Sequence, residues 1–188
     1  MNKSMLTTLG IIVAVVIIFA GIFISQYNKA IRMNEAVDAQ WAQVENQLKR
    51  RFDLIPNLVE TVKGFAAQEK DIFLGVAEAR KAYFSAQTVG DKAQAASGLE
   101  GALSRLLLLQ ERYPQLKSNE NFMKLQDSLE GTENRIAVER KRYNDQVQVL
   151  NTYVKTFPGK FFASWAGVNE AQYFEVPETQ QEVPKVTF

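Results

Sequence analysis

The residues of this sequence best suited to chemistry are charged side chains that interrupt apolar helical patterns. Glu69 stands between Phe65 and Ile72, where the repeat predicts a core residue. Polar residues fill the corresponding gaps of a later segment, and we expect them to meet Glu69 in a buried polar layer: Thr132, Glu133, Arg135, Glu139 and Arg140. A buried carboxylate must be paired or become protonated, because desolvation disfavours the ion. The layer would therefore either handle a proton or hold an ion pair, from Glu69 to Arg135 or Arg140, that fixes helix register.

The composition favours the ion pair over catalysis. The 188 residues include no His and no Cys, which excludes Ser-His-Asp and Cys-His catalysis, His- or Cys-based zinc sites, haem and iron–sulfur ligation. No phosphate-binding glycine motif accompanies Gly131 and the polar residues after it, so we interpret this glycine as a point of close helix approach or a kink. The sequence thus predicts no catalytic residue, no metal ligand and no cofactor.

Three consecutive basic residues, Lys49, Arg50 and Arg51, form a candidate interaction patch. If one helix runs to them from the N-terminal apolar segment, about 25 residues of helix hold them roughly 37 Å from lipid, far beyond a Debye length of about 8 Å. Nucleic acid is disfavoured too, since the chain has 22 basic and 21 acidic residues, one of the basic residues preceding the apolar segment. The remaining interpretations are a solvated face, ion pairs with carboxylates such as Glu45 on another helix, and a protein contact.

The N-terminus carries an apolar segment long enough to cross a bilayer. Met5–Ile24 is interrupted only by Thr7 and Thr8, and about 20 helical residues span the roughly 30 Å of hydrocarbon. A cleavable signal peptide has a shorter apolar region that ends at a small-x-small site, which this segment lacks. We predict a single-pass anchor whose partner is lipid. Basic residues on its two sides are nearly balanced, so the side of the membrane that holds the rest stays open.

Apolar residues then recur at helical spacing to about residue 157. Pro56, Pro114 and Pro158 divide this stretch, and Asn119 is suited to cap its last helix. The predicted fold is all-α: an N-terminal transmembrane helix, an antiparallel four-helix bundle with long helices, and an irregular aromatic C-terminal segment. The three parts are residues 1–26, 27–157 and 158–188, and the bundle helices cover about 27–54, 57–88, 92–113 and 119–156.

The last segment is too aromatic for a disordered tail. From residue 158 onward, six aromatic residues stand among Gly and Pro. We expect Tyr173, Phe174 and Phe188 to make its contacts, either on the chain's own bundle or on a neighbouring subunit.

Several motifs closely resemble the signature of the LemA family. The longest is Gln47–Val59, continued by Thr61–Gly64. The others are Glu111–Pro114 with Leu116–Lys117, Asn121–Phe122, Leu125–Gln126, Gly131–Ile136, Arg142–Asn144, Tyr173–Phe174 and the terminal Pro-Lys-Val-x-Phe. The resemblance covers the chain from Tyr27 to the end. It implies a bacterial single-pass membrane protein with a helical domain outside the bilayer, and it implies an architecture rather than an activity.

Three functions are compatible with these features. We favour a non-enzymatic, membrane-anchored scaffold or assembly protein of the bacterial inner membrane, homo-oligomeric and able to bind other envelope proteins. Restriction to a bilayer raises effective concentration and so favours self-association. The alternatives are membrane remodelling or envelope stress sensing through the anchor, and a carboxylate-based enzyme that uses Glu69 and Glu133.

Overall fold

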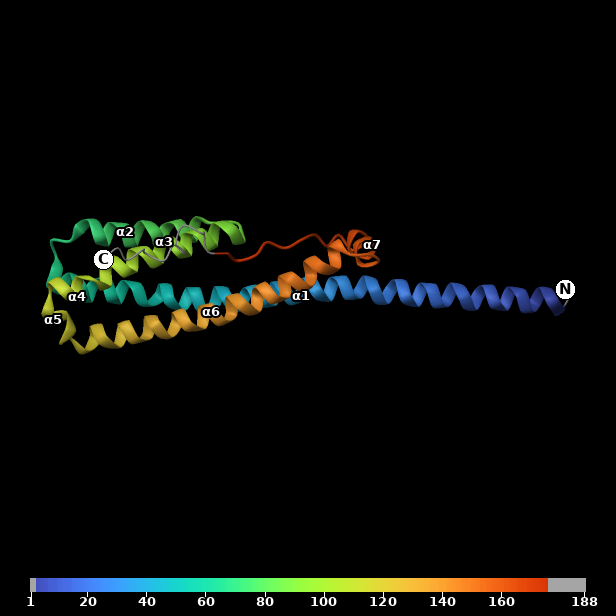
Figure 1. Ribbon diagram of the computed structural model, residues 1–188, viewed down its shortest axis with the longest axis horizontal. Helices are drawn as coiled ribbons and strands as arrows, with labels where there is room; N and C mark the ends of the chain where they lie inside the picture. Colours follow the sequence, from blue (N-terminus) through green and yellow to red (C-terminus); the bar gives the residue numbers. More distant parts are fainter. Residues whose placement is uncertain (1–2, 176–188) are drawn as a thin grey trace, which may run out of the picture. The chain divides into compact units, whose positions relative to one another are not determined.

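The structure, a computed structural model, describes residues 3–175, and every element within that range is a helix (Figure 1). The prediction of an all-helical chain with a long apolar N-terminal helix is confirmed. The helices are α1 (Lys3–Ala66), α2 (Lys70–Ser85), α3 (Val89–Leu107), α4 (Leu109–Arg112), α5 (Pro114–Lys117), α6 (Glu120–Lys155) and α7 (Gly159–Trp165).

The chain forms two compact units. Among the described residues, the first unit contains 3–40 and 145–171, and the second contains 41–144 and 172–175. The N-terminal part of α1 in the first unit exposes large apolar side chains from Leu9 to Ile24. Within the described part of the chain, α1 is the one helix long and apolar enough to cross a membrane, and its most apolar 18-residue window is 0% buried.

The core of the second unit is built from apolar faces that repeat every seven residues. On α6 the buried residues Phe122, Leu129, Ile136 and Tyr143 follow this spacing. On α1, two such series alternate: Val44 and Leu58 belong to one, and Leu48, Ile55 and Val62 belong to the other. Buried residues of the remaining helices complete the core: Val76, Tyr83, Ala93, Leu99, Leu103, Leu106, Leu109 and Leu116.

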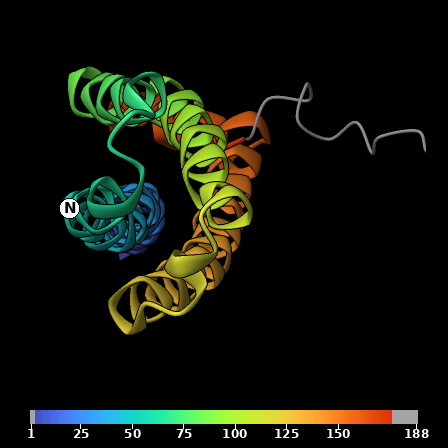
Figure 2. The ribbon, with the colours of Figure 1, turned by 90° about the vertical axis from the view of Figure 1, so that its left-hand side faces the viewer.

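Local signals explain where the helices of this unit begin. Thr88 caps α3: its hydroxyl oxygen accepts a hydrogen bond from the Asp91 N–H at 3.0 Å, and the hydroxyl donates to the Asp91 carboxylate at 2.8 Å. Asn119 accepts from the Phe122 N–H at 2.9 Å at the start of α6. Residues 86–88 connect α2 to α3, and the two helices lie side by side in both views (Figures 1 and 2).

Pro56 does not divide two helices as the sequence predicted. It lies inside α1, which continues to Ala66, and the turn to α2 falls at residues 67–69. A proline inside a helix costs about 3 kcal/mol. The residues on both sides of it, Phe52, Ile55, Leu58 and Val62, are at most 2% exposed on one continuous face, and burying four such side chains at about 1.5–3 kcal/mol each outweighs the cost. The third predicted helix is also shorter than expected, since α3 ends at Leu107 and the short α4 and α5 follow.

Candidate functional site

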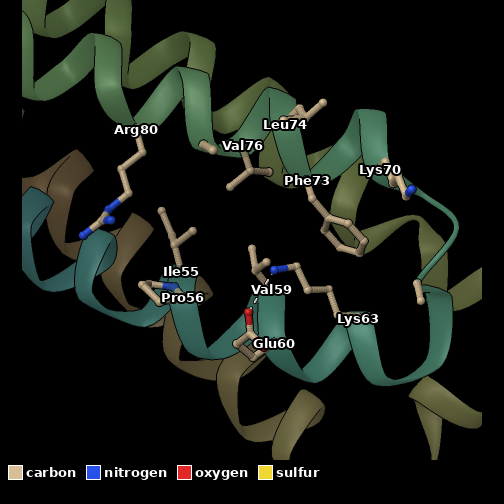
Figure 3. A pocket seen from close by; sticks show the side chains of 12 residues that line it. Ile55, Pro56, Val59, Glu60, Lys63, Lys70, Phe73, Leu74, Val76 and Arg80 are labelled. Atoms are coloured by element: carbon tan, nitrogen blue, oxygen red, sulfur yellow. Dashed lines mark hydrogen bonds and ion pairs between the residues drawn. The ribbon is translucent and has the colours of Figure 1, made fainter.

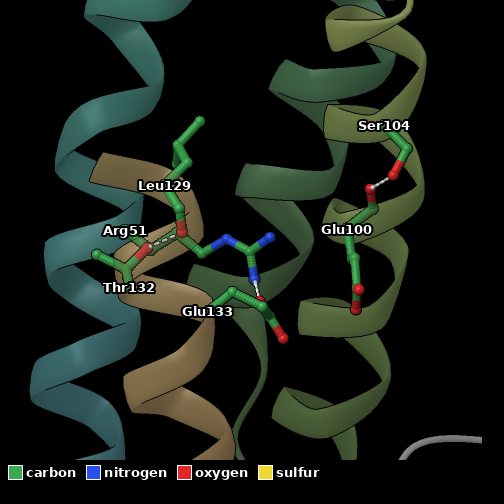
Figure 4. A network of polar contacts seen from close by, with 6 residues as sticks. All are labelled: Arg51, Glu100, Ser104, Leu129, Thr132 and Glu133. Carbon is green, nitrogen blue, oxygen red and sulfur yellow. Dashed lines mark hydrogen bonds and ion pairs between the residues drawn. The ribbon is translucent and has the colours of Figure 1, made fainter. Parts of the chain in front are cut away.

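A charged pair joins α1 to α6 inside the second unit (Figure 4). Arg51 Nη1 donates to Glu133 Oε2. The Arg51 side chain is 11% exposed, whereas that of Glu133 is 38% exposed. Arg51 stands seven residues after Val44 and seven before Leu58, so it occupies a core position of α1. An ion pair with a carboxylate on another helix was one of the interpretations of the basic patch, but Glu133 was not among the expected partners of Arg51.

An open cavity of about 260 Å³, with both polar and apolar lining, lies beside this pair. Its lining includes Glu100 and Ser104 as well as the two paired residues (Figure 4). Gln126 lines it too. Two buried polar atoms here, Arg51 Nε and Gln126 Oε1, have no hydrogen-bond partner among the described residues. The cavity is large enough to admit water, which buried polar groups of this kind ordinarily bind. The arrangement suits a hydrated structural ion pair.

The rest of the predicted polar layer does not converge on Glu69. Thr132 is 2% exposed, and its hydroxyl donates to the Leu129 carbonyl at 2.7 Å within α6. Glu139 pairs with Arg142 at 2.8 Å. Arg135 is exposed and Arg140 is half-buried. These residues lie along α6 rather than around one carboxylate.

Glu69 lies in the turn before α2 and pairs elsewhere. Its side chain is 17% exposed and accepts from Arg112 Nη1 at 3.1 Å and from the Tyr113 hydroxyl at 3.0 Å. Desolvation, and then the Glu69 carboxylate, raise the pKa of Tyr113. The expected partners Arg135 and Arg140 are therefore replaced by Arg112, because the turn places Glu69 beside α4 rather than against the middle of α6.

The basic patch separates into two environments. Lys49 and Arg50 are exposed, whereas Arg51 is half-buried and paired as described. Glu45, an expected partner for the patch, instead pairs with Lys92 of α3. The patch therefore offers two solvated charges and one structural charge.

An open apolar groove of about 650 Å³ lies between α1 and α2 (Figure 3). Ile55, Val59, Phe73 and Val76 supply apolar lining, and Leu74 beside them is 59% exposed. Cationic side chains also line it: Lys63, Lys70 and Arg80. Of these, Lys63 pairs with Glu60 at 2.9 Å. A groove of this character suits an apolar side chain or helix face flanked by acidic groups. The seven-residue repeat does not reveal this groove, since the lining of the groove lies partly outside the repeat.

Asparagine side chains hold the segment after α7. In the first unit, Asn151 donates to the Ala171 carbonyl at 2.9 Å and accepts from the Ala171 N–H at 2.8 Å. In the second unit, Asn144 makes the same two bonds with Phe174, at 3.1 and 2.9 Å. An amide side chain that pairs with both groups of one residue replaces the bonds of a sheet neighbour. Asn144 stands in one of the family motifs without an expected role, and Asn151 was not predicted, although the two asparagines are seven residues apart on α6.

The predicted C-terminal contacts have different environments. Phe174 is 3% exposed and contacts Trp41 with ring centroids 5.7 Å apart. Tyr173 is 38% exposed. Phe188 lies outside the described residues. Of the predicted contact residues that the structure describes, Phe174 thus packs on its own chain, whereas Tyr173 is largely accessible to solvent.

The described residues form a helical protein with an exposed apolar N-terminal segment, an apolar groove between α1 and α2, and isolated ion pairs. Among the described residues, no group of three or more Asp and Glu side chains is placed to hold a metal ion. The LemA family model matches residues 40–188, and the chain belongs to the LemA family. This agrees with the motifs that the sequence displays.

Curated relatives share a modest part of the chain's sequence, and the match covers about 70% of their own length. Magnetosome proteins MamQ 1 and MamQ 2 of Paramagnetospirillum magneticum (strain ATCC 700264 / AMB-1) are each 27% identical over 186 residues, which cover 85% of this chain and 68% of theirs. Magnetosome protein MamQ of Magnetospirillum gryphiswaldense is 27% identical over 192 residues, covering 88% of this chain and 71% of its own.

Proposed function

We propose that this LemA-family protein is a non-enzymatic, membrane-anchored helical scaffold of the bacterial inner membrane. The observation that carries the proposal is the apolar segment of α1, whose large side chains from Leu9 to Ile24, except Phe23, are exposed. A helix that is apolar all round is stable when lipid covers it. From the relatives, which are named as magnetosome proteins, we take only the idea of membership in a larger cellular assembly.

The domain outside the bilayer is, in this proposal, an antiparallel four-helix bundle that serves as a rigid binding element. The seven-residue repeats on α1 and α6 support it, as does the adjacency of α2 and α3. Its binding surface is the groove between α1 and α2, and we take the occupant to be a second copy of this chain. Anchoring in one bilayer concentrates copies, and the exposed apolar lining gains stability when it is covered.

The carboxylate-based enzyme receives no support from the placement of its candidate residues. Glu69 pairs with Arg112 near the turn before α2, and Glu133 pairs with Arg51 beside a cavity that Glu69 does not line. General acid–base catalysis by two carboxylates needs both groups at one substrate. The two glutamates therefore suit structural roles.

Cysteine cross-linking tests the scaffold directly, because the native chain has no thiol. Leu74→Cys places a thiol at the groove, and the matched control Asn134→Cys places one on the exposed side of α6. In native membranes, a bifunctional maleimide should join Leu74→Cys chains into dimers far more than Asn134→Cys chains. Equal, background-level cross-linking of both variants would contradict the groove as a self-association surface. Extraction of the chain by alkaline carbonate would contradict the anchor.

A further inference from the structure

Aromatic side chains cluster where the apolar segment of α1 ends. Phe23, in the last turn of that segment, contacts Phe162 and Trp165 of α7, with ring centroids 5.5 and 5.6 Å apart. Phe161 contacts the same two α7 rings, at 5.5 and 5.9 Å. We call Phe23, Phe161, Phe162 and Trp165, together with Phe157, the aromatic collar. All of it belongs to the first unit.

Specific contacts hold the collar at this level of α1. The Tyr153 hydroxyl donates to the Gln26 carbonyl at 3.1 Å, which ties the end of α6 to α1. Gly159 then lies so close to Tyr153 that a Cβ would stand 2.3 Å from the Tyr153 carbonyl oxygen. At the other end of α7, the Val168 N–H donates to the carbonyl of buried Ala163 at 2.9 Å. The depth of α7 along α1 is therefore set by packing.

The collar exposes far more apolar surface than a soluble helix end requires. Phe157 is 91% exposed, Trp165 is 65% exposed and Phe161 is 51% exposed. This surface continues directly from the exposed apolar helix, through Phe23. Lysines stand at the same end of the unit: Lys29, Lys155 and Lys160 are exposed or half-exposed, and Lys155 also pairs with Glu170 at 2.8 Å.

We infer that the aromatic collar is a second membrane-contacting element, which lies in the boundary between head groups and acyl chains. The inference rests on the proposed anchor: if the apolar segment fills the bilayer as far as Ile24, the contacts to Phe23 place Trp165 at the interface. Tryptophan and other aromatic rings are favoured at that depth, and basic side chains beside them attract anionic lipid. Phe157, Phe161 and Trp165 enter the lipid, and Lys160 faces the head groups. The collar thereby fixes how deeply the anchor sits.

The chain's two tryptophans permit a test with an internal control. Trp41→Phe leaves Trp165 in the collar, whereas Trp165→Phe leaves Trp41 in the second unit, where it contacts Tyr143 and Phe174. Each full-length variant is reconstituted into vesicles of phosphatidylcholine with a minority of phosphatidylglycerol. The phosphatidylcholine is brominated either near the head group or near the end of the acyl chain, and fluorescence quenching is measured.

The inference predicts that bromine near the head group quenches Trp165 emission about twofold or more, and more than bromine at the chain end does, while Trp41 stays unquenched. Lys160→Glu should reduce the Trp165 quenching in the anionic vesicles. Resistance to alkaline carbonate is measured on the same vesicles. Carbonate-resistant protein with unquenched Trp165 overturns the collar inference and leaves the anchor standing. Protein released by carbonate overturns the anchor, and the collar inference with it.

Discussion

The Arg51–Glu133 pair shows, at the scale of single residues, how a charge is tolerated at a core position. Replacing Glu133 by Gln leaves the Arg51 guanidinium, 11% exposed, without its anionic partner. We expect Glu133→Gln to lower the free energy of unfolding by about 1–3 kcal/mol, toward the lower end because Glu133 is partly exposed. Urea unfolding measures the change. The control Glu120→Gln, in a surface pair that is 86% exposed at the glutamate, should change stability by less than about 0.5 kcal/mol. Equal effects of the two variants would contradict the role of Arg51.

Asn144 acts on the backbone of the C-terminal segment rather than on another side chain. Asn144→Ala removes both of its hydrogen bonds to Phe174. We expect a loss of about 1–3 kcal/mol, since two backbone groups beside a buried ring lose their partners. Hydrogen exchange of the Phe174 amide should accelerate strongly in Asn144→Ala. It should stay unchanged in Asn134→Ala, which alters an exposed asparagine of the same helix.

The ionisation of Tyr83 should make the free energy of unfolding depend on pH in the alkaline range. Burial, and then the negative charge of Glu45, raise the pKa of Tyr83 above its ordinary value of 10.0. The folded state therefore holds the phenolic proton more tightly than the unfolded state. The resulting stability is fully present below about pH 10 and is lost as pH rises from there through the folded-state pKa.

Tyr83→Phe removes this titration. Its free energy of unfolding should fall less steeply with pH above about 10 than that of the unaltered chain, as measured by urea unfolding at several pH values. Parallel pH profiles for the two proteins would show that Tyr83 is not held in its neutral form by its surroundings.

At the scale of elements, Gly131 tests the effect of helix propensity and Gly159 tests the effect of close packing. Nothing lies within 4 Å of where a Cβ would stand at Gly131, inside α6, so close approach does not explain this glycine. Gly131→Ala should raise the free energy of unfolding by about 0.5–1 kcal/mol. Gly159→Ala should lower it and loosen α7, because its Cβ would meet Tyr153. Thermal unfolding compares them, and destabilisation by both substitutions would contradict the packing at Gly131.

Helices marked by strong apolar periodicity could be predicted from the sequence, whereas features that depend on tertiary packing could not. The apolar N-terminal segment and the α6 repeat are strong periodic signals, and Asn119 caps α6 where capping chemistry indicates it. Pro56 misled the prediction because the local cost of proline is visible in a sequence, whereas the continuous buried face that offsets it is visible only in the fold. The predicted partner of Glu69 was wrong for a similar reason, because the turn at residues 67–69 determines where the Glu69 side chain lies.

The whole molecule combines features that sequence reasoning identified with surfaces that it did not. The LemA motifs and the apolar segment were both readable, and the family is confirmed. The groove between α1 and α2 could not be predicted from the sequence, because a groove depends on how two helix faces diverge and not on the residues of either face alone. Self-association through that groove is the property on which the scaffold proposal depends most.

The mass of the full-length protein after extraction in a mild detergent tests the scaffold most directly. Light scattering with correction for bound detergent gives the number of 21.2 kDa chains per particle. We predict a discrete particle of two or more chains, preserved when residues 5–22 are replaced by an unrelated apolar span and dissociated by Leu74→Glu at the groove. A particle of one chain, from membranes in which Leu74→Cys also fails to cross-link, would contradict the account.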